Sequence, residues 1–232
     1  MKHMKRVCDM SLNNKVTIPN VISQVAGNLL LLVEEGLSRL YPREPRKQLS
    51  EANFRYNREN DIQNTVINDQ ASGYETGVNK LKIGKADMGS CGCEVIAVYN
   101  ALALLDKKCS IAETERAFEL DGAMTKVPFV PIGKYGSNPY ALKRMTESFG
   151  LNAEKVSKKQ LLNEKGLYIF SYWNYGGLMK GLHTITAKND GQSFILYNYA
   201  NKGDTVISPY EWDERFWKRF IIGYRITEKE NT

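Results

Sequence analysis

The sequence holds few cysteines and almost no histidine. Its 232 residues include four cysteines, Cys8, Cys91, Cys93 and Cys109, and only two histidines. Secreted domains built on disulfides are far richer in cysteine, and Cys91 and Cys93 are too close in sequence to form an easy bridge with each other. We therefore expect reduced thiols and a cytoplasmic protein.

Long hydrophobic runs are also missing. The apolar stretch 16–33 is interrupted by Asn20, Ser23, Gln24 and Asn28, and the basic residues 1–10 are not followed directly by an apolar segment. These features fit neither a membrane span nor a signal peptide. The sequence therefore predicts no membrane partner.

Neither sign of charge dominates the chain. There are 32 basic and 26 acidic residues, which gives a formal net charge of +6. The basic residues are spread out apart from Arg43, Arg46 and Lys47, and no basic stripe with interleaved aromatics is present, so we expect no nucleic-acid partner. The hydrophobic fraction of 42% is that of an ordinary globular protein and predicts a packed core.

The two ends of the chain differ in the regularity of their pattern. Residues 1–80 are predicted to hold a polar tail, one helix that begins at Pro19 and ends before Pro42, and a polar arm over 43–80 that is either ordered or a flexible linker. Residues 81–232 carry clear helix and strand signals, and they are predicted to form the main domain.

In this domain the helices come first and strands dominate later. The apolar run from Cys93 to Leu105 predicts a helix buried on most sides. Ser110, Ser157 and Ser208, and the segment 137–139, each carry the capping signals that begin a helix. Strands are predicted over 151–156, 167–173, 183–188, 192–199 and 220–227. This order predicts an α+β fold in which a layer of helices packs on an antiparallel sheet.

Cys93 begins the buried helix, directly after Gly92. The unpaired N–H groups and the positive dipole end of a helix start favour thiolate, which is the nucleophilic form of cysteine. Gly92 would let a substrate backbone come close. Glu94 complements the dipole of the first turn, so we expect a structural role for it. The alternative for Cys93 is that of a small buried hydrophobe.

A thiolate–imidazole pair needs a histidine, and His183 is the candidate because His3 lies in the polar tail. If Asp190 and Gly191 form a two-residue turn, His183 lies directly opposite Asn198 on the neighbouring strand. The carboxamide oxygen of Asn198 would then accept the imidazole N–H and orient the ring. The same register puts Ile185, Ala187, Phe194 and Leu196 on the buried face of the hairpin, and Thr184, Thr186, Lys188 and Ser193 on the other face.

The order of these parts resembles that of the papain-like cysteine peptidases. The segment Cys93-Glu94-Val95-Ile96-Ala97-Val98-Tyr99-Asn100-Ala101-Leu102 is similar to the nucleophile helix of that clan. The stretch from Gly136 to Leu151 is similar to its bacterial branch, which contains the double-glycine leader peptidases and their relatives. The resemblance covers roughly residues 85–227.

This resemblance implies a papain-like fold and hydrolysis of a peptide bond through an acyl-enzyme on Cys93. His183 would be the general base and acid, and Asn198 the orienting residue. The backbone N–H of Cys93 would form part of the oxyanion hole. The substrate would be a peptide or protein, with no cofactor and no metal.

The predicted oxyanion region, Asp87 and Gly92, departs from the family. A glutamine usually precedes the cysteine by a few residues and supplies a second donor to the oxyanion, but residues 85–88 contain none. An ionised Asp87 would repel an oxyanion, and loss of one donor lowers the rate roughly a hundred- to a thousandfold. A donor from elsewhere, Gln70 or Asn79, stays open.

Cys91 is a second departure and an alternative nucleophile, since its Cys-Gly pair also resembles the helix start of the leader peptidases. Three other functions stay open as well. The same triad suits an acyltransferase or amidase, and the missing glutamine suits a catalytically weak peptide-binding relative. Cys91, Cys93 and His183 could instead ligate a metal, although the paired spacing of structural zinc sites is absent.

Overall fold

The computed structural model describes residues 18–38, 44–73, 76–124, 136–175, 177–199 and 203–229. The predicted polar tail, with His3 and Cys8, lies outside these ranges. Within them, no helix combines the length and the apolar content that crossing a membrane requires.

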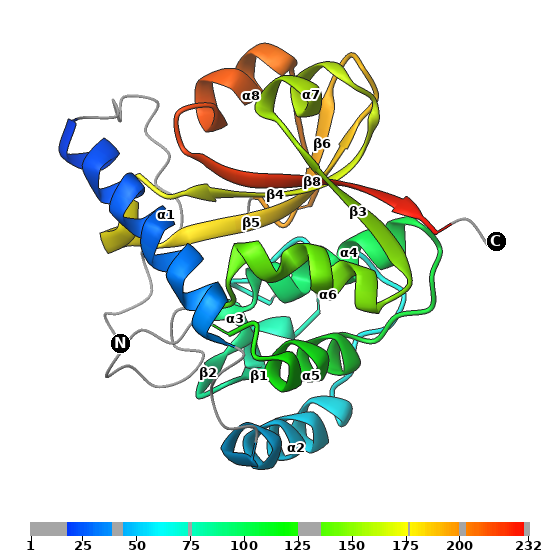
Figure 1. The fold of residues 1–232 in the computed structure, drawn as a ribbon. Coiled ribbons are helices and arrows are strands. Elements are labelled where there is room, and N and C mark those ends of the chain that lie inside the picture. Colours follow the sequence, from blue (N-terminus) through cyan, green and yellow to red (C-terminus); the bar gives the residue numbers. More distant parts are fainter. Residues whose placement is uncertain are drawn as a thin grey trace.

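A six-stranded antiparallel sheet lies at the centre of the fold, with strand order β3-β8-β4-β5-β6-β7 (Figure 1). Its strands are β3 (Leu151–Val156), β4 (Gly166–Trp173), β5 (Leu182–Asn189), β6 (Phe194–Tyr197), β7 (Thr205–Ile207) and β8 (Phe220–Glu228). Helices pack on this sheet, so the predicted α+β class is confirmed.

Helices cover both faces of the sheet (Figure 1). On one face lie α3 (Met88–Cys91), α4 (Cys93–Leu104), α5 (Ile111–Asp121) and α6 (Leu142–Ser148), and on the other lie α7 (Lys158–Asn163) and α8 (Pro209–Phe216). The apolar core is accordingly divided into two clusters. One joins α4 to α5, α6 and the sheet, and the other joins the sheet to α7 and α8.

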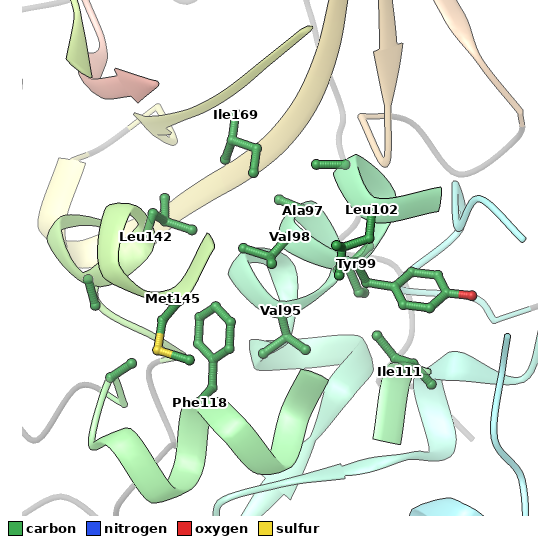
Figure 2. Packing of buried hydrophobic residues seen from close by; sticks show 14 of the residues in the cluster. Val95, Ala97, Val98, Tyr99, Leu102, Ile111, Phe118, Leu142, Met145 and Ile169 are labelled. Atoms are coloured by element: carbon green, nitrogen blue, oxygen red, sulfur yellow. The ribbon is translucent and has the colours of Figure 1, made fainter. Parts of the chain in front are cut away.

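The helix α4 is the centre of the larger cluster. Every residue from Cys93 to Leu102 is buried, as the nearly continuous apolar run predicts. Figure 2 shows Val95 and Val98 of α4 among Phe118 of α5, Met145 of α6 and Ile169 of β4. Because α4 is packed on all sides, its first turn has a fixed position beside the inner strands β4 and β5.

The local signals for helix starts are confirmed. The hydroxyls of Ser110, Ser157 and Ser208 accept hydrogen bonds from backbone N–H groups one turn later, at the starts of α5, α7 and α8. The segment at 137–139 begins the short 3₁₀ helix η2 (Pro139–Ala141), which leads into α6.

The first helix, α1 (Ile18–Ser38), lies across the end of the β4–β5 pair at which Trp173 pairs with Leu182 (Figure 1). It packs on η2 and on the 3₁₀ helix η3 (Gly177–Lys180). Trp173 lies against Gly27, and its indole Nε1 donates to Asn28 Oδ1 over 3.0 Å. The outer face of α1 exposes Val21, Ile22, Val25, Leu29, Leu32, Val33 and Leu37.

The stretch predicted as a polar arm contains a second helix, α2 (Glu44–Arg58), which packs on α5. Its inward side chains are polar, because their partners are backbone groups of the small hairpin of β1 (Lys82–Ile83) and β2 (Ala86–Asp87). Asn53 donates to the carbonyl of Gly84 over 2.9 Å, and Asn57 to that of Lys82 over 2.9 Å. The described residues of this stretch therefore belong to the packed body.

Two buried glutamates of α5 lie beneath these asparagines. Glu115 and Glu119 hydrogen-bond to each other, and each also accepts a hydrogen bond, from Asn57 over 3.2 Å and from Asn53 over 2.7 Å. Burial and the neighbouring Glu119 raise the pKa of Glu115 from 4.5 to about 11. Glu115 therefore keeps its proton at neutral pH.

Candidate functional site

The hairpin that carries the candidate histidine has a different register from the predicted one. Asn189 pairs with Phe194 and Ala187 with Leu196, so residues 190–193 form a four-residue loop. The side chain of Asp190 causes this, since its Oδ1 accepts from the backbone N–H groups of Gln192 and Ser193 over 2.8 and 2.7 Å. The predicted two-residue turn, and the direct pairing of His183 with Asn198, are therefore wrong.

Both faces of β5 are buried. Ile185 and Ala187 face α7 and α8, as the predicted buried face requires. Thr184 and Thr186 of the opposite face are also fully buried, because α4 covers them. The Thr186 hydroxyl donates to the carbonyl of Ala97 over 2.8 Å. The strand of His183 is thus packed directly on the helix that Cys93 begins.

Asn198 does contact His183, but through its main chain. The His183 Nε2 lies 2.7 Å from the backbone oxygen of Asn198. A carbonyl oxygen only accepts, so Nε2 carries the hydrogen and Nδ1 is the basic nitrogen of the neutral ring. The residue is partly exposed, and burial of the ring lowers the pKa of His183 below its usual 6.5.

The carboxamide of Asn198 has a different task. Its Oδ1 accepts from the backbone N–H of Gln70 over 3.2 Å, and its Nδ2 donates to Gln70 Oε1 over 2.8 Å. Asn198 has a φ of 61°, in the left-handed region that asparagine tolerates better than most residues. These bonds fix the turn whose carbonyl orients His183, so the predicted side-chain contact is replaced by a main-chain one.

Gln70 connects this turn to the start of the cysteine segment. Its Nε2 donates to the carbonyl of Met88 over 3.0 Å and lies 3.4 Å from that of Gly89. The Nε2 group of Gln70 therefore already donates to a backbone carbonyl. The other open candidate for an oxyanion donor, Asn79, donates to the carbonyl of Ser72 over 2.8 Å.

The Cys93 thiol lies buried at the start of α4 and is not held as a thiolate. Its Sγ donates to Glu94 Oε2 over 3.1 Å. Burial, and then the charge and the hydrogen bond of Glu94, raise the pKa of Cys93 well above its usual value, while the backbone N–H of Thr184 acts in the opposite direction. The expectation that the helix start favours thiolate is therefore wrong, because desolvation and a neighbouring carboxylate outweigh the dipole.

Glu94 is fully buried and is the centre of a hydrogen-bonded chain. Besides the Cys93 thiol, it accepts the Thr184 hydroxyl at Oε1 over 3.2 Å. The Thr184 oxygen lies 2.7 Å from the Ser171 hydroxyl of β4. The backbone N–H groups of Glu94 and Ser137 also stabilise the carboxylate, but burial dominates and raises the pKa of Glu94 to about 7.

The remaining predicted residues lie around this chain. The Cys91 thiol, the alternative nucleophile, is buried, and its Sγ lies 3.5 Å from the Ser90 hydroxyl. Burial raises the pKa of Cys91 as well. Gly92 separates α3 from α4, and a Cβ there would lie 2.0 Å from Met88 Sδ. Asp87 forms an exposed ion pair with Lys82 at 2.6 Å.

Two predicted contacts are not formed among the described residues. No hydrogen bond joins Cys93 to His183, although both residues have hydrogen-bond partners. No group of three or more histidine, cysteine, aspartate or glutamate residues in these ranges is arranged to hold a metal ion. Cys91, Cys93 and His183 are thus not gathered as ligands.

Sequence reasoning gave Glu94 no part in the chemistry and overlooked Thr184 and Ser171. Their contact depends on which face of β5 meets α4, and the alternation of residues along β5 does not reveal that. No family model and no curated protein matches this chain. The arrangement itself places a thiol and a carboxylate at the start of α4, where Thr184 of β5 contacts both of them. The neighbouring His183 supplies an imidazole of known tautomer, which faces Tyr172. These are the groups that nucleophilic acyl chemistry uses.

Proposed function

We propose that this protein is a papain-like thiol hydrolase that cleaves peptide bonds. Cys93 attacks the peptide carbonyl, His183 is the general base and acid, and Asn198 orients the imidazole through its backbone carbonyl. The product of the first step is a thioester on Cys93, which water then hydrolyses. The backbone N–H of Cys93 contributes to the oxyanion hole.

One observation carries this proposal. The strand that carries the imidazole lies against the thiol, because the backbone N–H of Thr184, the residue after His183, stabilises the Cys93 sulfur. The Asn198 carbonyl holds the proton on Nε2 and leaves Nδ1 free of hydrogen. A nucleophile and a base whose tautomer is fixed by a third group are the parts that nucleophilic catalysis requires.

The raised pKa of Cys93 favours a second candidate, a catalytically weak relative that binds peptides. A buried neutral thiol attacks slowly, since thiolate is the reactive form. The two candidates differ in turnover, and they share the same peptide-binding surface around Cys93 and His183.

A peptide-cleavage assay tests the proposal. The protein would be incubated with a mixture of synthetic peptides, and the products identified by mass spectrometry. We expect cleavage by the wild type and by Cys91→Ser, and at least a thousandfold loss in Cys93→Ser, since removal of a nucleophile leaves only residual catalysis. Peptide binding without cleavage by the wild type would support the second candidate and refute the hydrolase.

A further inference from the structure

Within the part of the chain that the structure describes, the Cys93 thiol has one close proton acceptor, and it is a carboxylate. The Cys93 Sγ lies 3.1 Å from Glu94 Oε2, within the range in which a general base takes a proton. Among the described residues, His183 makes its hydrogen bond to the Asn198 carbonyl instead. The geometry therefore pairs the nucleophile with Glu94 more directly than with the imidazole.

Glu94 is held as an acceptor by donors of fixed direction. The Thr184 hydroxyl donates to Glu94 Oε1, so the hydrogen of the 2.7 Å contact between Thr184 and Ser171 must come from Ser171. All three side chains are fully buried. The order of donation is thus Ser171 to Thr184 to Glu94, and the Cys93 thiol completes the set on the other carboxylate oxygen.

Among the described residues, the groups that hold this carboxylate are neutral. They are the Cys93 thiol, the Thr184 hydroxyl and the backbone N–H groups of Glu94 and Ser137. A buried carboxylate without a cation is expensive to keep ionised, and these donors offset that penalty only in part. Burial leaves the pKa of Glu94 at about 7, so the acid and the carboxylate are close in free energy near neutral pH.

We propose that Glu94, in place of His183, is the catalytic residue that takes the Cys93 proton during attack, with Thr184 and Ser171 as its positioning residues. This inference rests on the proposed thiol chemistry of Cys93. As the bond from Sγ to the carbonyl carbon forms, the thiol proton moves to Glu94 Oε2 and the carbonyl electron pair moves to oxygen. When the C–N bond breaks, its electron pair stays on nitrogen, which takes the proton from the Glu94 carboxyl.

His183 then serves the second half of the reaction, because its Nδ1 carries no hydrogen and the residue is partly exposed. Its Nδ1 takes a proton from the water that attacks the thioester. The C–S bond breaks with its electron pair on sulfur, and the thiolate takes that proton back from His183. Cys93, Glu94 and His183 thereby return to their starting protonation states.

The first test measures the rate of Cys93 alkylation by iodoacetamide between pH 5 and 10, with peptide mapping of the adduct. In the wild type we expect the rate to rise with pH around 7, as Glu94 ionises. In Glu94→Gln the alkylation rate of Cys93 should not increase around pH 7, and at pH 7.5 it should be at least tenfold lower than in the wild type. Glu113→Gln, an exposed glutamate in the first turn of α5, is the matched control and should retain the wild-type profile.

A second pair of variants keeps the charge of Glu94. Thr184→Val removes one hydrogen bond from the Glu94 carboxylate and so raises the pKa of Glu94. The pH at which the Cys93 alkylation rate increases should therefore be higher than in the wild type. Thr186→Val is its matched control, because the Thr186 hydroxyl donates to Ala97 and not to Glu94. An unchanged midpoint in Thr184→Val would overturn the proposal even if Glu94→Gln does not fold.

The outcomes separate this inference from the proposed function. If Glu94→Gln reacts as fast as the wild type, or faster, Glu94 does not accept the thiol proton, while the hydrolase proposal survives. If wild-type Cys93 reacts no faster than a free thiol at any pH, the thiol chemistry itself is refuted, and the role of Glu94 with it.

Discussion

The proton that Glu115 keeps should make the folded state sensitive to alkaline pH. In the folded chain the pKa of Glu115 is raised from 4.5 to about 11, so the folded state keeps a proton that the unfolded chain releases. The contribution of this proton to the free energy of unfolding is complete below pH 4.5 and is lost as the pH rises towards 11. For one whole proton the free energy of unfolding falls by about 1.4 kcal/mol per pH unit. Between pH 6 and 8 the loss is therefore about 3 kcal/mol.

Glu115→Gln should remove most of this slope. The glutamine amide can donate to Glu119 in place of the Glu115 carboxyl, and it does not titrate. Urea unfolding followed by tryptophan fluorescence at pH 6, 7 and 8 would measure the slope, with Glu154→Gln on an exposed position of β3 as the control. If the stability of Glu115→Gln falls with pH as steeply as that of the wild type, the raised pKa of Glu115 does not cause the slope, and the argument is refuted.

Three further predictions concern the glycines of α1, the imidazole of His183 and the side chain of Asn198. Gly27→Ala should lower the free energy of unfolding by roughly 1–3 kcal/mol, because its Cβ would lie 2.5 Å from Trp173 Cζ2. Gly36→Ala, whose Cβ meets nothing within 4 Å, should raise the free energy of unfolding by about 0.5–1 kcal/mol. Equal effects of the two substitutions would contradict the close packing of Gly27 on Trp173. By NMR, His183 should titrate below 6.5, and a value at or above 6.5 would contradict burial of its ring. Asn198→Ala should lose roughly 1–3 kcal/mol of stability and shift the His183 titration, and Asn198→Gly, which tolerates the φ of 61°, should lose less.

Features that depend on a few neighbouring residues could be predicted from the sequence. Ser110, Ser157 and Ser208 begin helices because their hydroxyls satisfy N–H groups only one turn away. The long apolar run of α4 predicts a buried helix from its own residues, without knowledge of the elements that pack on it. The α+β class follows from the order of these local signals.

Features set by distant contacts could not be predicted. The helix α2 shows little apolar periodicity, because Asn53 and Asn57 bind backbone groups of a hairpin that lies further along the chain. Gln70 and Asn198 are 128 positions apart, and nothing near either residue indicates their pairing. The predicted register of the hairpin is wrong for another reason. The side chain of Asp190 stabilises a four-residue loop, which shifts every pair of the hairpin by two residues.

The orienting contact to His183 has a consequence for mutagenesis. Side-chain replacement cannot remove it, because the acceptor is the peptide oxygen of Asn198. An alanine scan would report only the indirect effect of a displaced turn. Chemical synthesis or ligation can change the atom itself: replacing Tyr199 with its α-hydroxy acid turns the preceding amide into an ester, whose carbonyl is a weaker acceptor. Such a single-atom exchange would weaken the hold on the imidazole and leave every side chain in place.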